Sequence, residues 1–209
     1  MSAKSFYTDE AKKSVSATIA AIEGVTSAEV VVTLRAASGS YRHADYLAGA
    51  VLTFAGLCFF LFYPADFRTE VFPIEALLLF IGGSALSAYL PPLRRLFSSR
   101  AHRAESVLTA ARAAFVAQGI SRTRGRSGIL VFVSMLERRV EIVADIGVDE
   151  EALGAPWKEA RARLAGSIAG DPTIERFIEA LAALGPALHE KMPRAEDDVN
   201  ELSDEVVSA

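Results

Sequence analysis

The stretch that decides the architecture is residues 46–90, which reads YLAGAVLTFAGLCFFLFY (46–63), PADFRTE (64–70) and VFPIEALLLFIGGSALSAYL (71–90). The first run contains no charged residue, and as a helix it would be roughly 27 Å long, close to the thickness of the hydrocarbon core of a bilayer. The second run is similar and carries one acid, Glu75. These runs predict a transmembrane helical hairpin. The alternative is a buried core hairpin of a soluble protein.

Small residues gather in the second run of this hairpin. Gly83 and Ser87 lie four residues apart, with Gly82, Ser84 and Ala88 beside them. Small side chains at this spacing allow two helices to approach closely. We therefore predict helix packing through Gly83 and Ser87. The same residues also offer a route to a homo-oligomer assembled through the hairpin.

Arginines outside the hairpin predict its orientation. They are concentrated near its two outer ends, and the connecting turn holds only Arg68; the outer ones are Arg35, Arg42, Arg94, Arg95, Arg100 and Arg103. Because basic residues are enriched on the cytoplasmic side of a membrane, both termini and the folded domain are predicted to be cytoplasmic. The predicted location is the cytoplasmic (inner) membrane, with two spans and the lipid bilayer as one partner.

The remaining residues predict one α/β domain that the hairpin interrupts. Residues 1–45 supply its first helix and strand, residues 91–191 supply the rest, and residues 192–209 form an acidic, flexible tail. The β-branched run at 30–34, the apolar run at 129–134 and the alternating run at 139–144 predict strands, the last two joined as a hairpin. Helices are predicted at 5–23, 102–118, 149–169 and 172–191. The formal net charge of −4 gives no signature of nucleic-acid binding.

Four segments in this order carry a family resemblance. They are EGVTSAEVVV (23–32), AAFVAQGI (113–120), RTRGRSGILVFVSMLERRVEIVADIGV (122–148) and the helical C-terminal region. Together they resemble the TPM domain family, and more narrowly a bacterial subgroup in which a transmembrane hairpin is inserted after the first strand. The resemblance implies a mixed β-sheet flanked by helices on both faces. Some relatives are described as weak acid phosphatases that bind divalent metal, and others as assembly or maintenance factors for membrane protein complexes.

Acidic residues follow the strand at 139–144. Asp145, Asp149 and Glu150 surround Gly147, and carboxylate oxygens suit Ca²⁺ or Mg²⁺. The resemblance makes this the place to expect a metal, with Asp145 the first candidate ligand. The alternative is that Asp149 and Glu150 begin a helix, where acids meet the positive end of the helix dipole.

A basic, glycine-containing loop precedes the strand at 129–134. Arg122, Arg124 and Arg126 could bind phosphate or contact anionic lipid headgroups, and a solvated loop is the alternative. The turn that holds Glu137 is expected to be a solvated tip. The histidines His43, His102 and His189 lie far apart in the sequence, which disfavours a zinc site.

These patterns favour a membrane-anchored protein that binds rather than catalyses. The expected role is an accessory factor for a membrane or envelope complex, because the sequence offers an anchor and charged loops but no recognisable catalytic set. The alternative is a weak phosphatase that depends on a divalent metal held by Asp145 with Asp149 or Glu150.

Overall fold

The computed structural model of the chain describes residues 3–64, 68–195 and 199–208. The chain divides into two compact units. Gly39–Arg103 form one, here called the hairpin unit, and Met1–Ser38 with Ala104–Ala209 form the other, here called the α/β unit. The hairpin unit therefore interrupts the sequence of the α/β unit directly after the first strand.

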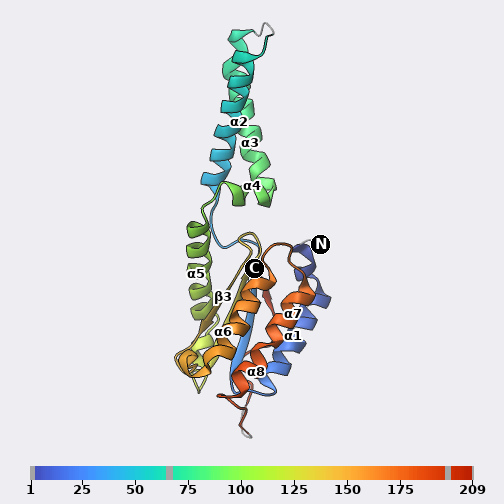
Figure 1. The fold of residues 1–209 in the computed structure, drawn as a ribbon, viewed down its shortest axis with the longest axis vertical. Coiled ribbons are helices and arrows are strands. Elements are labelled where there is room, and N and C mark those ends of the chain that lie inside the picture. Colours follow the sequence, from blue (N-terminus) through green and yellow to red (C-terminus); the bar gives the residue numbers. More distant parts are fainter. Residues whose placement is uncertain (1–2, 65–67, 196–198, 209) are drawn as a thin grey trace. The chain divides into compact units, whose positions relative to one another are not determined.

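The α/β unit is built on a mixed sheet of four strands (Figure 1). The strands are β1 (Glu29–Arg35), β2 (Gly128–Ser134), β3 (Arg139–Ala144) and β4 (Val207–Ser208), in the order β3-β2-β1-β4. β1 runs parallel to β2 and to β4, while β2 and β3 are antiparallel. The predicted mixed α/β fold is confirmed.

Helices cover both faces of this sheet. Successive residues of a strand point to opposite faces, so the apolar strands contribute side chains to a core on each side. Val30, Val32 and Leu34 of β1 face a core that they share with α1 (Asp9–Glu23), α6 (Glu150–Ser167), α7 (Ile174–Ala182) and α8 (Leu184–His189). Val31, with Leu130 and Phe132 of β2, packs on the other face against α5 (Arg100–Ala117). Short 3₁₀ helices occur at Ala3–Tyr7, Thr69–Val71 and Ile120–Arg122.

Two predicted C-terminal helices are interrupted in the structure. Gly154 has a φ of 64° inside α6, just before Pro156, and the backbone there leaves the helical conformation. The predicted helix 172–191 is divided into α7 and α8 at Ala183. Both interruptions lie near a glycine or a proline, the residues that weaken a helix most.

Glu137 was expected at a solvated turn, and this expectation is wrong. The side chain is only 4% exposed. One of its oxygens accepts the backbone N–H of Ser38 at 2.9 Å, and the other accepts the hydroxyl of Ser134. A buried backbone donor needs an acceptor, and Glu137 supplies it where the chain leaves β1.

The C-terminal segment also differs from the flexible tail that was predicted. Pro193 forms a bridge with Thr26, and residues 207–208 add β4 to the sheet beside β1. The open edge of β1 explains the difference, because unpaired strand edges bind extended segments. The acidic residues 196–198 lie outside the described residues.

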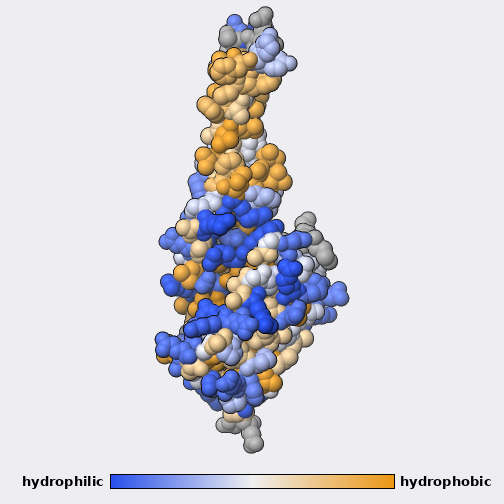
Figure 2. Space-filling model, viewed as in Figure 1, coloured by the Kyte–Doolittle hydropathy of each residue, from blue (hydrophilic) through white to orange (hydrophobic). Residues whose placement is uncertain are grey.

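The hairpin unit consists of α2 (Arg42–Phe62), α3 (Phe72–Tyr89) and the short α4 (Pro91–Leu96). α2 and α3 are long and apolar enough to cross a membrane, and little of either is buried. Phe62 is 84% exposed, and Figure 2 shows a nearly continuous hydrophobic surface along both helices. Pro91 and Pro92 follow α3 and begin α4, since proline is well tolerated in a first helical turn.

Candidate functional site

The two loops singled out in the sequence lie against each other at one end of the sheet. The backbone N–H of Gly147 donates to the carbonyl oxygen of Arg126 at 2.9 Å. A Cβ atom added to Gly147 would lie 2.2 Å from the carbonyl oxygen of Gly125, so only glycine allows this approach. The basic loop and the acidic loop therefore form one feature, which we call the loop pair and define as residues 122–128 and 145–150.

A bidentate ion pair joins the two loops. The guanidinium of Arg126 donates to both oxygens of Asp145, at 2.7 and 2.9 Å, and the backbone N–H of Ile146 donates to the same carboxylate at 2.8 Å. Asp145 is buried, whereas Arg126 is half exposed. The hydrogen bonds from Arg126 lower the pKa of Asp145 below its ordinary value, although burial opposes this shift. Asp145 is thus an ionised acceptor with three donors.

The other two predicted metal ligands have different partners. Asp149 caps the N-terminus of α6 by accepting the backbone N–H groups of Glu151 and Ala152, both at 3.0 Å. Glu150 accepts the indole N–H of Trp157 at 3.0 Å and is paired with Arg161. In the described part of the chain, no three His, Cys, Asp or Glu side chains are grouped so that they could hold a metal ion. Binding of Ca²⁺ or Mg²⁺ remains an untested prediction, and it would require these side chains to exchange their partners.

The three arginines of the basic loop have separate surroundings. Arg126 pairs with Asp145, as described above, and Arg122 lies at the end of a 3₁₀ turn. The backbone N–H of Arg124 donates to the carboxylate of Glu201 at 3.1–3.2 Å. Arg124 also lines a polar cleft of about 400 Å³ together with Glu29 and Glu201. The cleft joins the loop pair to the C-terminal segment, a connection that the sequence did not indicate.

A buried acidic cluster lies beside this cleft. Glu23, at the end of α1, accepts the backbone N–H of Val30 at 2.9 Å and the side-chain amide of Asn200 at 3.3 Å. Burial raises the pKa of Glu23 to about 8, and the nearby negative charges of Asp204 and Glu29 contribute in the same direction. The sequence analysis missed Glu23 and Glu29. The sequence feature that could have indicated them is their position, since Glu23 ends a helix and Glu29 begins an apolar strand.

The hairpin unit contains its own buried carboxylate, Asp45. Arg94 donates to both oxygens of Asp45 at 2.7 and 2.9 Å, and the hydroxyl of Ser87 donates to it at 2.9 Å. These bonds link α2 to α3 and α4. Ser87, predicted as a packing residue, therefore lies between the two helices of one hairpin.

Gly83 lies where the same two helices pack closely together. A Cβ atom on Gly83 would be 3.0 Å from the Cα of Gly49, and one on Gly49 would be 2.3 Å from the hydroxyl of Ser84. Gly83 and Ser87 thus contact α2 of their own chain, which leaves other surfaces of the hairpin for any oligomer. His43 and His102, far apart in the sequence, lie together with ring centroids 5.0 Å apart.

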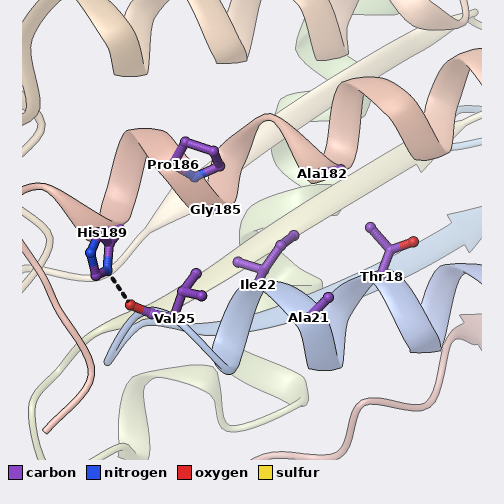
Figure 3. A pocket seen from close by; sticks show the side chains of 8 residues that line it. All are labelled: Thr18, Ala21, Ile22, Val25, Ala182, Gly185, Pro186 and His189. Atoms are coloured by element: carbon purple, nitrogen blue, oxygen red, sulfur yellow. Dashed lines mark hydrogen bonds between the residues drawn. The ribbon is translucent and has the colours of Figure 1, made fainter.

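An apolar pocket of about 370 Å³ lies between α1 and α8 (Figure 3). Ile22 and Val25 line one side, and Gly185 and Pro186 line the other. His189 closes one end, where its Nδ1 lies 2.6 Å from the carbonyl oxygen of Val25. The pocket has few polar groups, so it offers no set of side chains for catalysis.

Comparison with known proteins supports the fold. No family model matches the chain, and no curated protein matches it. The structure is similar to the NMR structure of BA42, a protein from the psychrophilic bacterium Bizionia argentinensis, with a TM-score of 0.57 and 15% sequence identity. The match covers 97% of this chain and 94% of BA42. At this identity the likeness is one of fold.

Proposed function

We propose that this chain is a membrane-anchored protein with a TPM-like domain that acts by binding, as an accessory factor for a membrane or envelope protein complex. The observation that carries the proposal is the outward-facing apolar surface of α2 and α3. Large apolar side chains are exposed along both helices, among them Phe54, Leu61, Phe62, Ile74 and Leu78. An apolar surface of this extent needs a cover, and a bilayer provides one along the whole length of a helix.

The orientation follows from the charges at the two ends of the hairpin. Arg42, Arg94 and Arg95 lie at the end where the chain enters and leaves the hairpin unit, and Arg68 lies in the turn between α2 and α3. The positive-inside bias favours the end with more arginines on the cytoplasmic side. We therefore propose two spans in the inner membrane of a bacterium, with the α/β unit in the cytoplasm.

Binding is favoured over catalysis by the state of the charged residues at the loop pair. Asp145, Asp149 and Glu150 each accept hydrogen bonds from different donors, so the phosphatase alternative lacks the convergence of carboxylates on which it depends. A site of stable, mutually satisfied charges suits a rigid surface that another protein recognises. The resemblance to TPM domains that serve membrane complexes supports the same proposal.

Membrane topology provides the first experiment. In a Cys58→Ser background, single cysteines are introduced as Arg68→Cys in the hairpin turn and Ser203→Cys in the C-terminal segment. A membrane-impermeant maleimide applied to intact spheroplasts should label Arg68→Cys alone, and permeabilisation should add Ser203→Cys. Recovery of the chain in the soluble fraction, or labelling in the reverse pattern, would contradict the anchor or its orientation.

The choice between binding and catalysis needs its own measurement. Hydrolysis of p-nitrophenyl phosphate by the detergent-solubilised chain is compared with that of Asp145→Asn, with Mg²⁺ or Ca²⁺ added. We expect no metal-dependent turnover that the substitution removes. Robust turnover that is lost in Asp145→Asn, with the fold intact by circular dichroism, would favour the phosphatase.

A further inference from the structure

Positive charge is concentrated at one end of the hairpin unit. The segments 39–45 and 90–103, through which the chain enters and leaves the two long helices, contain five arginines and one aspartate, a formal excess of four positive charges. The aspartate, Asp45, is paired with Arg94. The excess therefore rests on the other arginines of these segments, which are Arg42, Arg95, Arg100 and Arg103.

The fold brings these side chains together from two places in the sequence. His43, at the start of α2, and His102, in the first turn of α5, lie edge to face with ring centroids 5.0 Å apart. The ring of Tyr41 lies beside both, at 6.2 and 5.8 Å. Because Arg42 adjoins His43 and Arg103 adjoins His102, this contact gathers the arginines as well. We call the following residues the basic cluster: Arg42, His43, Arg95, Arg100, His102 and Arg103.

Arg103 fixes the chain between α4 and α5. Its Nη1 donates to the carbonyl oxygens of Arg95 and Ser98, both at 2.6 Å, and to the hydroxyl of Ser98 at 2.9 Å. These acceptors are neutral, so they orient the guanidinium and leave its formal charge in place. Arg42 and Arg100 are exposed, as are both histidines. The basic cluster is thus held in position from within and accessible from outside.

Apolar side chains continue directly from the basic cluster. Tyr89 at the end of α3, Leu90 after it and Leu96 of α4 are all exposed. The exposed apolar surface of α2 and α3 lies beyond them. A tyrosine beside arginines at the end of an apolar helix is typical of the boundary between lipid tails and headgroups. A ligand that contacts both surfaces would carry a charged group and apolar chains.

The charge of the cluster favours an anion over a metal ion. Two neighbouring imidazoles could bind a transition metal, but Arg42 and Arg103 would repel a cation there. In the described part of the chain, no third His, Cys, Asp or Glu completes a metal site with them. Guanidinium groups instead donate well to phosphate oxygens. Phosphate joined to apolar chains, at the end of a membrane-spanning hairpin, is the chemistry of an anionic phospholipid.

We propose that the basic cluster is a binding site for the phosphodiester headgroup of an anionic phospholipid, and that Tyr89, Leu90 and Leu96 contact the adjoining part of its acyl chains. A zwitterionic phospholipid is disfavoured, because its ammonium group would lie close to the arginines. In the proposed orientation the lipid belongs to the cytoplasmic leaflet. This inference rests on the proposed membrane anchor and names a lipid partner for it.

The experiment measures lipid selectivity with the full chain in a nonionic detergent. Calorimetric titrations compare phosphatidylglycerol with phosphatidylcholine of the same acyl chains. The test variant is Arg42→Gln with Arg100→Gln, because both side chains are exposed. The matched control, Arg68→Gln with Arg112→Gln, removes the same charge at two exposed positions outside the cluster. Circular dichroism confirms that each variant is folded.

We expect phosphatidylglycerol to bind about tenfold tighter than phosphatidylcholine to the unaltered chain and to the control, and about equally to phosphatidylcholine in the test variant. Raised salt should weaken the preference, since the contacts are exposed to water. Equal binding of the two lipids by the unaltered chain, or an undiminished preference in the test variant, would overturn the proposal. Full competition by free glycerol 1-phosphate would also overturn it, because the cluster would then recognise a soluble phosphate ester.

Flotation with vesicles of phosphatidylcholine alone separates this inference from the anchor. A chain that floats with these vesicles and resists alkaline extraction, yet shows no preference for phosphatidylglycerol in the titrations, retains the anchor and loses the lipid site. A chain that stays in the soluble fraction loses both.

Discussion

The two units of this chain bury carboxylates in two different ways. Asp45 in the hairpin unit is 6% exposed and meets a guanidinium and a hydroxyl, from Arg94 and Ser87. Glu23 in the α/β unit is 8% exposed and meets a backbone N–H and an amide, with other acids close by. The first group is held in an ion pair, whereas burial raises the pKa of the second to about 8.

The difference follows from the donors that each environment provides. Within α2 and α3 the backbone N–H groups are used inside the helices, so a carboxylate between them must be satisfied by side chains. At the edge of a sheet, free backbone N–H groups are available, and a neutral carboxyl suffices. The hairpin unit therefore contains a stable ion pair between Asp45 and Arg94, while the α/β unit contains a carboxyl, Glu23, whose protonation responds to pH.

Removing the ion pair between Asp45 and Arg94 should have the largest effect on stability. Arg94→Leu leaves the Asp45 carboxylate buried without its cation, and we expect a loss of about 3–5 kcal/mol in the stability of the hairpin. Unfolding in detergent micelles, followed by protease resistance of the hairpin, measures this loss. Arg100→Leu removes an exposed arginine nearby and should change little. The double variant Asp45→Leu with Arg94→Leu should recover most of the stability, since no charge is left unpaired.

Titration of Glu23 should make the stability of the α/β unit depend on pH. Because the pKa of Glu23 rises from 4.5 to about 8 on folding, its contribution is fully present below pH 4.5 and is lost as the pH rises to about 8. The slope is at most about 1.4 kcal/mol per pH unit. Glu23→Gln keeps an acceptor for Val30 and should flatten the curve between pH 4.5 and 8. Denaturant unfolding of both proteins tests this.

A second acid on the same helix provides a control for the pH dependence assigned to Glu23. Glu10 is exposed in the first turn of α1, and Glu10→Gln should leave the pH curve unchanged. A similar flattening in Glu10→Gln would assign the slope to the overall charge of the chain. Residues 199–208, which contact Glu23 through Asn200, should show faster hydrogen exchange at pH 9 than at pH 6 in the unaltered chain and in Glu10→Gln, but not in Glu23→Gln.

Packing of the hairpin should be sensitive to a single methyl group. Gly49→Ala places a Cβ atom 2.3 Å from the Ser84 hydroxyl and 2.6 Å from the carbonyl oxygen of Phe80, so the helices must move apart. We expect a loss of about 1–3 kcal/mol from this overpacking. Gly82→Ala is the matched control, because a Cβ atom there meets nothing within 4 Å. Equal melting temperatures for the two variants would contradict the close approach of α2 and α3.

Much of the fold could be predicted from local patterns. The strands at 30–34, 129–134 and 139–144 were read from apolar runs, and each lies within an observed strand. The sequence also indicated the hairpin within a few residues of α2 and α3. These features depend on periodicity and hydropathy, which neighbouring residues determine. β4 could not be predicted in this way, since two residues carry no period and pair with a strand far away in the sequence.

The contacts of the site were harder to predict, because they join residues far apart in the chain. The sequence singled out Asp145 and the basic loop separately, but not that Arg126 would occupy both oxygens of Asp145. Glu23 and Glu29 were missed for the same reason, since their partners Asn200 and Glu201 lie more than 170 residues away. A buried acid is visible in a sequence only when its partner is nearby, and here the fold supplies the partner.

The smallest expected effect concerns the ion pair between Arg126 and Asp145. It resembles the Asp45–Arg94 ion pair of the hairpin unit, but Arg126 is half exposed to water. Asp145→Asn keeps one acceptor oxygen and loses the charge, so we expect a cost of about 1–2 kcal/mol at pH 7. Because Arg126 lowers the pKa of Asp145, this contribution is present above pH 3.8 and is lost as the pH falls through the folded-state pKa. The difference between the two proteins should therefore shrink in acid. Asp149→Asn, which retains a capping side chain, should match the unaltered chain.

The same variants decide whether the ion pair excludes a metal. Calorimetric titration with Ca²⁺ or Mg²⁺ should give no saturable heat that depends on Asp145, because a cation would have to displace Arg126 from both carboxylate oxygens. Saturable binding that is lost in Asp145→Asn and kept in Asp149→Asn would contradict this. It would show that the Asp145 carboxylate exchanges the guanidinium for a metal. Asp145 would then be a carboxylate that changes its state with conditions, as Glu23 does, rather than one in a permanent ion pair, as Asp45 is.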